Sequence, residues 1–325
     1  MKSIATWKLI NASLNDGIAV MLLYVLESSG SSPGRRGFFM GVNEKGDMEG
    51  SIGGGIMEHK FVEMAKEKLR AAGYEPRATS LRKQLHDKAA AKNQSGMICS
   101  GEQTILLYRL QQPDYAVIQN IITSLEQNKN GTLQLFPSGI NFSTTVAEKD
   151  FHFEMRSEED WEYVEKTGYK NQLFIIGGGH CALALSKLMR HMDFYTRVYD
   201  DRKELKTMLE NTDAQEKHFV NDYSELKDLI PSGAQHYVVI MTFGYRTDDT
   251  AIRALMEKEF GFLGVLGSRS KIKKMMTEYR NGNIKEELLQ RIHAPAGLFI
   301  KSQTPEEIAV SIAAEIIAIK NKNAS

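Results

Sequence analysis

The sequence predicts an α/β protein with two domains: an N-terminal α/β domain, and a C-terminal domain built on a doubly wound, Rossmann-like parallel sheet. The first observation is length, because 325 residues exceed what one average core organises. The second is a regular alternation of strands and helices from Gln172 onward, which is typical of a parallel sheet with crossover helices. The third is a pair of glycine-rich turns, in GSIGGGIMEH (50–59) and FIIGGGHCAL (174–183), each between a strand and a helix.

Composition argues against several classes of protein. Lysine plus arginine and aspartate plus glutamate number 41 each, so no net charge draws the chain to nucleic acid or to an anionic membrane. The two cysteines, Cys99 and Cys181, lie far apart without metal-ligand spacing, which argues against a disulfide scaffold or a zinc site and for a reducing compartment. The apolar run 17–26 is too short to span a bilayer and lacks a signal peptide's cleavage site. We therefore expect a cytoplasmic protein.

The first elements are justified by their apolar patterns. Trp7, Ile10 and Leu14 fall on one face of an opening helix, and the following run of Val, Leu and Tyr is typical of a buried strand. SSGSSPGRRG demands an irregular loop. We expect, in order, a helix at 1–16, a strand at 17–26, a loop at 28–37, hairpin strands at 38–43 and 46–52, and a helix at about 56–71.

The rest of this domain is less regular. Residues 76–97 are polar and mixed, and QTILLYRL then predicts a strand at 103–110 that closes the first unit. A helix at about 114–128 and a hairpin of 131–136 with 139–145 follow. The charged stretch RSEEDWEYVEK (156–166), before Gly168, is the candidate boundary. The predicted domains are 1–165, with a core of 1–110 and an extension of 111–165, and 166–325.

In the second half, strands and helices alternate to the end of the chain. The expected strands are 172–177, 196–201, 218–220, 235–243 and 262–268, and the expected helices are 182–192, 203–210, 248–259, 270–280 and a long closing helix. Thr304, Pro305 and Glu307 form a strong start signal for the closing helix. Its body, 308–319, is apolar almost all round, so we expect it to be buried under the sheet or against a second protomer.

The second glycine turn fits G-x-G-x-x-A directly after a strand. Gly177 permits the tight turn, Gly179 lets a phosphate approach the backbone, and Ala182 lets the helix pack closely. Asp200 ends the next strand, where an acid takes the ribose hydroxyls of a dinucleotide. The order of strand, glycines, helix, strand and acid predicts a dinucleotide-type site. The alternative is that the glycines serve only close packing, or bind a different phosphate ligand.

Other side chains are expected at the same edge of the sheet. His180 would be the first side chain that a bound phosphate meets, unless it is only solvent-exposed or structurally satisfied. Arg202 would accept a 2′-phosphate that Asp200 would repel, so the choice between NAD and NADP stays open. The loop with Thr242 follows a buried strand. Three residues form a possible second anion site, or simply a solvated helix start: Gly267, Ser268 and Arg269.

The first glycine turn lacks the acid of a dinucleotide fingerprint. Gly53, Gly54 and Gly55 nevertheless precede a helix, so they can present free N–H groups to an anion. The loop before them adds hydroxyl and guanidinium groups that suit an oxyanion or a phosphate, from Ser31, Ser32, Arg35 and Arg36. From the chemistry alone, a glycine hinge beside a basic surface loop is favoured as the explanation of these residues.

Several motifs, in order along the chain, resemble the XdhC/CoxI family. GSSPGRRG, GSIGGGIMEH and GMICSGEQTILL (96–107) are similar to the family's N-terminal domain. IIGGGHCALAL, VYDDR, VIMT, LGVLGSRSK and HAPAGLFIKSQTPEEIAVSIAAEI are similar to its C-terminal Rossmann domain. Two departures stand out: Cys99-Ser100-Gly101 replaces the family's Cys-Gly-Gly, and Phe243 and Tyr245 stand where the family often has histidines.

The resemblance implies an accessory and maturation role for xanthine dehydrogenase and related molybdenum hydroxylases. Such proteins are understood to bind newly made molybdenum cofactor, to help a cysteine desulfurase exchange an oxo ligand for sulfur, and to deliver the cofactor to the apoenzyme. Because molybdopterin carries a phosphate, both glycine turns and the arginine loop suit it. Cys99 would hold molybdenum or relay sulfur, unless it is an inert buried cysteine. We also expect a homodimer.

Two other functions are compatible with the Rossmann half alone. One is an NAD(P)-dependent oxidoreductase, although the sequence shows no obvious proton-transfer pair such as Tyr-x-x-x-Lys. The other is a degenerate Rossmann protein that mediates only contacts between protomers, although the intact glycine fingerprint argues against it. We therefore predict a cofactor-binding maturation factor rather than a catalyst.

Overall fold

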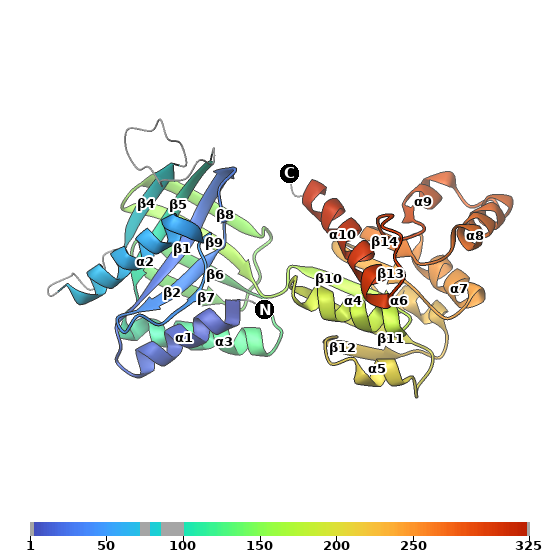
Figure 1. Cartoon of the computed structure of the whole chain (residues 1–325), viewed down its shortest axis with the longest axis horizontal. Coiled ribbons are helices and arrows are strands. Elements are labelled where there is room, and N and C mark those ends of the chain that lie inside the picture. The colour runs from blue at the N-terminus through green and yellow to red at the C-terminus, as the bar shows by residue number, and fades with distance from the viewer. Residues whose placement is uncertain (1–2, 72–78, 86–100, 324–325) are drawn as a thin grey trace. The chain divides into compact units, whose positions relative to one another are not determined.

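The chain folds into two compact units. The computed structural model describes residues 3–71, 79–85 and 101–323, and the units comprise Met1–Gly168 and Tyr169–Ser325 (Figure 1). The boundary expected between residues 165 and 166 lies inside a strand, Asp160–Thr167, so the division comes at the end of that strand. No helix in the described ranges is long and apolar enough to cross a membrane.

The N-terminal unit contains two antiparallel sheets and three α-helices in its described part. Its elements are α1 (Ser3–Asn15), β1 (Val20–Gly30), β2 (Phe39–Asn43), β3 (Met48–Gly50), α2 (Gly55–Arg70), β4 (Ser80–Leu85), β5 (Gly101–Arg109), the 3-10 turn η1 (Gln112–Asp114), α3 (Tyr115–Glu126), β6 (Gly131–Phe136), β7 (Gly139–Ser143), β8 (Phe151–Ser157) and β9 (Asp160–Thr167). One sheet has the strand order β3-β2-β1-β5-β4 and the other β7-β6-β9-β8.

Strand β1 is buried on both faces. Its successive side chains point to opposite sides of the sheet, and each side packs in a different apolar cluster. Met21, Leu23 and Val25 pack in one apolar cluster with the inner face of α2. Leu22 and Tyr24 pack on the other side with α1, α3 and the second sheet. The continuous apolar run at 17–26 therefore marks the central strand between two layers of core.

One sequence expectation for this unit needs correction, and the structure assigns two segments whose secondary structure the sequence left open. The loop expected at 28–37 starts later, since β1 continues through Gly30 and pairs there with Gly101 of β5. The polar segment 76–97 contains β4, an edge strand paired with β5. The stretch 156–166, named above as the candidate boundary, lies in the β8–β9 hairpin. Its Trp161 and Tyr163 are buried in the core and alternate with charged residues that are less buried.

The C-terminal unit confirms the predicted doubly wound parallel sheet. Its described elements are β10 (Asn171–Ile176), α4 (His180–Arg190), β11 (Phe194–Asp200), α5 (Lys206–Glu210), β12 (Glu216–Phe219), η2 (Tyr223–Glu225), α6 (Leu226–Leu229), β13 (Gly233–Ile240), α7 (Tyr245–Leu255), β14 (Phe260–Val265), α8 (Arg269–Asn281), α9 (Glu286–Gln290), β15 (Ile292–His293) and α10 (Pro305–Asn323). The strand order β12-β11-β10-β13-β14-β15 is the Rossmann order 3-2-1-4-5-6.

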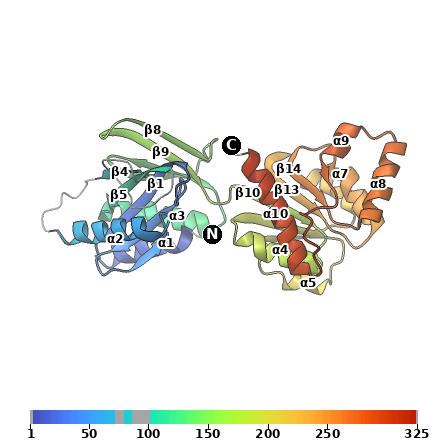
Figure 2. The same cartoon turned by 45° about the horizontal axis from the view of Figure 1, so that its top comes forward.

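Helices cover both faces of this sheet. The helices α7 and α8 pack with β10, β13 and β14 residues in one apolar cluster, and α4 and α10 pack in another on the opposite face. The closing helix α10 runs beside α4 (Figure 2) and buries Ile312 and Ile316 under the sheet. Of the two burial sites expected for this helix, the one under the sheet is therefore confirmed. Val310 on its outer face is half exposed.

Candidate functional site

Three motif segments of the N-terminal unit meet at one end of its five-stranded sheet. The segments are the loop after β1, the glycine turn before α2, and the start of β5. The buried Gln103 of β5 joins them, because its Nε2 donates hydrogen bonds to the carbonyl oxygens of Gly34 (2.9 Å) and Ile52 (3.4 Å). Residues that are far apart in the sequence thus form one loop cluster.

Glycines permit the close approach of these loops. A Cβ added at Gly34 would lie 1.9 Å from the Ile52 carbonyl oxygen, and one at Gly53 would lie 2.4 Å from the Gly34 nitrogen. Gly53 also has φ +132°, which side chains rarely adopt. Gly54 differs, because nothing lies within 4 Å of its added Cβ. The turn at Gly53–Gly55 therefore packs against the loop on one side and is open on another.

Glu58 occupies the turn that the sequence predicted as an anion site. Its Oε2 accepts hydrogen bonds from the backbone nitrogens of Ile52 (2.9 Å) and Gly54 (3.0 Å), and from the Ser51 hydroxyl (2.7 Å). A carboxylate of the chain thus stands where an external anion was expected. Glu58 was not among the residues predicted from the sequence, although an acid in the first turn of a helix is a recognisable signal.

The predicted serine and arginine residues have different environments. Ser32 is buried and donates to the Gly34 carbonyl oxygen (3.2 Å), whereas Ser31 is exposed. Arg35 is exposed and its Nη1 donates to the Gly30 carbonyl oxygen (2.9 Å). Arg36 is half-buried, and its backbone nitrogen donates to the Ser28 hydroxyl (3.0 Å). Ser31 and Arg35 are therefore the exposed polar groups of the loop, and Cys99 lies outside the described residues.

A largely buried polar cluster of Tyr24, Tyr163 and Glu165 links the two sheets of the N-terminal unit. The hydroxyls of Tyr24 and Tyr163 both donate to Oε2 of Glu165, at 2.5 and 2.8 Å. Burial raises the pKa of both tyrosines, and the neighbouring Glu165 carboxylate raises it further, so both stay protonated donors. The positive charge of Arg36 acts in the opposite direction on the pKa of Tyr163. The cluster thus connects β1 of one sheet to β9 of the other.

In the C-terminal unit the glycine loop lies at the carboxyl edge of the parallel sheet. Gly177 has φ +107°, and its added Cβ would lie 2.4 Å from the Met241 carbonyl oxygen at the end of β13. The Gly178 carbonyl oxygen accepts a hydrogen bond from the Thr207 hydroxyl (2.6 Å). Gly179 begins α4 without a side-chain cap, and nothing lies within 4 Å of its added Cβ. His180 is exposed. The open side of Gly179 suits the approach of a phosphate.

Asp200 was expected from the sequence to bind ribose hydroxyls, but in the structure its carboxylate bonds to groups of the protein. Its carboxylate is fully buried and accepts from the Gly178 nitrogen (2.6 Å) and from Nη2 of Arg202 (2.8 Å) on Oδ2. Its Oδ1 accepts from the backbone nitrogen and Nε of Arg202, at 2.8 and 2.9 Å. Burial acts to raise the pKa of Asp200, but these hydrogen bonds outweigh it and lower the pKa. Their stabilisation is present at neutral pH and is lost as the pH falls through the lowered pKa.

The ends of β13 and β14 form another bonded network. Asp248 is fully buried, and its Oδ1 accepts from the backbone nitrogen (3.0 Å) and the hydroxyl (2.6 Å) of Thr242. Lys271 of α8 forms an ion pair with Oδ2 of Asp248. The predicted ligand residue Thr242 is thus engaged within the protein.

The residues of the predicted second anion site also have partners within the chain. Ser268 caps α8 by accepting from the Lys271 nitrogen (3.3 Å). The guanidinium of Arg269 lies 4.9 Å from the ring centroid of Phe299. At Gly267 an added Cβ would lie 3.1 Å from the Lys271 side chain. The structure therefore favours a helix start over a dedicated anion site at these residues.

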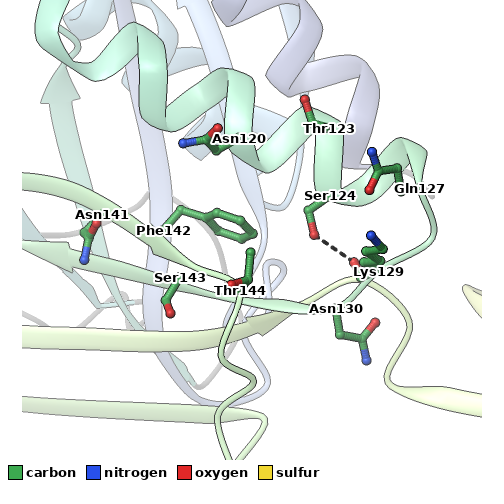
Figure 3. A pocket seen from close by; sticks show the side chains of 10 residues that line it. All are labelled: Asn120, Thr123, Ser124, Gln127, Lys129, Asn130, Asn141, Phe142, Ser143 and Thr144. Carbon is green, nitrogen blue, oxygen red and sulfur yellow. Dashed lines mark hydrogen bonds between the residues drawn. The ribbon is translucent and has the colours of Figure 1, made fainter.

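A separate surface cavity lies between α3 and β7 in the N-terminal unit. Its volume is about 810 Å³. Figure 3 shows side chains of α3, such as Asn120 and Ser124, opposite the ring of Phe142 of β7. None of the site residues predicted from the sequence lines it. Within the described ranges, no group of three or more His, Cys, Asp or Glu side chains is arranged to hold a metal ion.

The fold and site together define a two-unit α/β protein whose C-terminal unit is a Rossmann domain with a dinucleotide-type glycine loop. Comparison with known families gives the same assignment. The profile of the XdhC Rossmann domain matches residues 173–316, and that of the XdhC and CoxI family matches residues 13–78. The chain belongs to the XdhC and CoxI family.

Individual relatives cover the chain to different extents. A probable xanthine dehydrogenase subunit from Bacillus subtilis (strain 168) is 21% identical over 97% of both chains. The uncharacterized protein YqeB of Escherichia coli (strain K12) is 29% identical over 160 residues, which span 49% of this chain but only 29% of YqeB.

A solved structure confirms the fold over the whole chain. The crystal structure of a xanthine dehydrogenase from Bacillus halodurans superposes with a TM-score of 0.71 and 21% identity. The alignment covers 99% of this chain and 96% of that one. At this identity the likeness shows a shared fold.

At the C-terminal glycine turn, one added methyl group should destabilise the protein strongly at Gly177 and hardly at all at Gly179. Gly177→Ala should destabilise the C-terminal unit by about 2 kcal/mol or more, since it combines a positive φ with a clash against β13. Gly179→Ala should change stability by less than about 0.5 kcal/mol, because its added Cβ meets nothing. Urea unfolding followed by hydrogen exchange measures both. Equal stability of the two variants would contradict the geometry.

Removing the Glu58 carboxylate should destabilise the N-terminal unit. Glu58→Ala should lower the free energy of unfolding by about 1–3 kcal/mol, because three donors at the turn lose their shared acceptor. The matched control is Glu63→Ala on the same helix, which breaks an exposed pair with Lys66 and should leave the free energy of unfolding almost unchanged, because solvent screens such a pair. Hydrogen exchange at the amides of Ile52 and Gly54 should rise in the first variant only. Unchanged exchange there would show that Glu58 does not hold the turn.

Proposed function

We propose that this protein is an accessory factor for a xanthine dehydrogenase-type molybdenum hydroxylase. It binds newly made molybdenum cofactor as its cargo, assists a cysteine desulfurase in exchanging an oxo ligand for sulfur, and delivers the cofactor to the apoenzyme. Membership of the XdhC and CoxI family supports the proposal. So does the Bacillus subtilis relative, which is named as a probable xanthine dehydrogenase subunit and matches over nearly the whole chain. Because YqeB is matched over less than a third of its length, it adds no argument about function.

The observation that carries the proposal is the loop cluster around Gln103. It brings the serine and arginine loop and the glycine turn to one end of the sheet. Molybdopterin carries a phosphate, and the exposed guanidinium of Arg35 and the hydroxyl of Ser31 are groups that bind phosphate. The turn amides already bond to Glu58, so we assign the phosphate contacts to side chains of the loop.

Cys99 is the proposed chemical group of the site. Thiolate is a soft metal ligand and a good nucleophile, so it suits either molybdenum or the transfer of sulfur. The cysteine stands two residues before Gly101 in the sequence, and an added Cβ at Gly101 would lie 2.7 Å from the Ser32 nitrogen. A homodimer completes the proposal, with sedimentation equilibrium as its direct measurement.

An NAD(P)-dependent oxidoreductase is the alternative that the Rossmann unit suggests. It requires a group that gives or takes a proton beside the nicotinamide. At the ends of β13 and β14, Thr242, Asp248 and Lys271 are bonded to one another, which favours a structural role for them. Turnover of a nicotinamide nucleotide by the purified protein alone, followed by its absorbance, would instead support the oxidoreductase.

Cofactor binding is tested by what copurifies with the protein. We expect a pterin in mass spectra of the native protein purified anaerobically from a molybdenum-replete host. Arg35→Ala should reduce the pterin content about tenfold, as expected when one charge-assisted contact to a phosphate is lost. The control is Arg156→Ala, an exposed arginine of β8 that pairs only with nearby acids. Pterin-free protein under these conditions would argue against the proposal.

Substitution of Cys99 should impair the sulfuration of the client enzyme without affecting the folding of this protein. Cys99→Ser should reduce the activity of the client hydroxylase while leaving the melting temperature of this protein unchanged. Cys181→Ser is the matched control, because burial raises the pKa of the Cys181 thiol and disfavours its thiolate. The measurement is client activity with and without chemical sulfuration by sulfide. Full client activity with the Cys99 variant would remove this residue from the mechanism.

A further inference from the structure

We propose that the C-terminal unit has a nucleotide subsite, formed by Arg202 and Phe243, that selects a ribose bearing a phosphate over a ribose with free hydroxyls. The subsite lies at the ends of β11 and β13, which flank β10 and its glycine loop. The ligand class is a nucleotide with a phosphorylated ribose and a planar base. This proposal is independent of the molybdenum cofactor site in the N-terminal unit.

Asp200 has no lone pair left for a ribose hydroxyl. A carboxylate offers about four acceptor positions. Four N–H donors occupy them: two on Oδ1, both from Arg202, and two on Oδ2, from Gly178 and Arg202. The side chain is also fully buried. The acid that would bind a free ribose diol in a dinucleotide site is therefore committed to the protein itself.

Arg202 is held in place with donors to spare. Its Nε and Nη2 bond to Asp200, while its side chain keeps 38% of its surface exposed. Within the described part of the chain, neither N–H of its Nη1 has a hydrogen-bond partner. Oδ1 of the neighbouring Asp201 accepts a hydrogen bond from the Tyr223 hydroxyl (3.2 Å) and lies 3.9 Å from Nε of Arg202, as a second and weaker ion pair. Because Asp200 already fixes the guanidinium, a phosphate that binds to it loses little conformational entropy.

An exposed aromatic ring lies beside this guanidinium. Phe243 follows β13 and is 90% exposed. The Arg202 guanidinium carbon lies 5.7 Å from the centroid of its ring, within the range of a cation–π contact. A large exposed aromatic side chain at the ligand edge of a Rossmann sheet offers a face on which a planar base can stack, and such stacking tolerates different bases. The pair thus places a phosphate-binding cation next to a base-binding ring.

The experiment compares three probes on the full-length protein by isothermal titration calorimetry. The probes are adenosine 2′,5′-bisphosphate, adenosine 3′,5′-bisphosphate and adenosine 5′-monophosphate. At least one bisphosphate should bind about tenfold or more tightly than the monophosphate, as expected for one charge-assisted contact. A preference for the 2′ isomer identifies a 2′-phosphorylated dinucleotide as the ligand type, and a preference for the 3′ isomer identifies a coenzyme A-type nucleotide.

Variants separate the two parts of the subsite. Arg202→Ala should abolish the preference for the bisphosphate, and Arg202→Gln should do the same while still donating to Asp200 and preserving the fold. Phe243→Ala should weaken all probes by a similar factor. Arg253→Ala is the control, since the contacts it removes are an ion pair with Asp249 on α7 and a cation–π contact with Tyr279 of α8, and neither residue belongs to the proposed subsite. Equal affinity for all probes, no binding of any probe, or a preference that survives both Arg202 variants would overturn the proposal.

Discussion

Carboxylates that accept backbone N–H groups at the ends of strands organise the loops of both units. Such side chains include Glu58, Asp200, Asp248 and Glu315. They accept from the nitrogens of Ile52 and Gly54, of Gly178, of Thr242 and of Gly297, respectively. A buried N–H without a partner is costly, and a turn that leaves a strand exposes several. The protein satisfies them internally, and this constraint decides which groups remain for a ligand.

The consequence differs between the two units. In the N-terminal unit Glu58 uses the amides of the glycine turn, so phosphate recognition falls to the side chains of the neighbouring loop. In the C-terminal unit Asp200 uses one amide of the glycine loop and orients Arg202, while the side of Gly179 stays open. One glycine-rich turn is closed by its own acid, and the other keeps space for a ligand.

The regular pattern of the C-terminal half made its fold predictable. Apolar strands alternate there with amphipathic helices, and this alternation predicts a parallel sheet with crossover helices. The N-terminal half was harder. The strand β4 is polar because it lies at a sheet edge, and the charged residues around Trp161 and Tyr163 hid the alternation of β9. An edge strand with one solvated face has little apolar signal, so single-sequence patterns underestimate it.

By itself the sequence determined the Rossmann class, the glycine fingerprint and the motifs that define the family, because each depends on residue types at short spacing. Only the tertiary structure decided which groups are free. It showed that Gln103 joins two loops to β5, that Glu58 accepts the N–H groups of one turn, and that Arg202 and Gly178 occupy the acceptor positions of Asp200. The reason is physical: whether a polar group can bind a ligand depends on the partners that folding brings to it, and many of those partners come from remote parts of the chain.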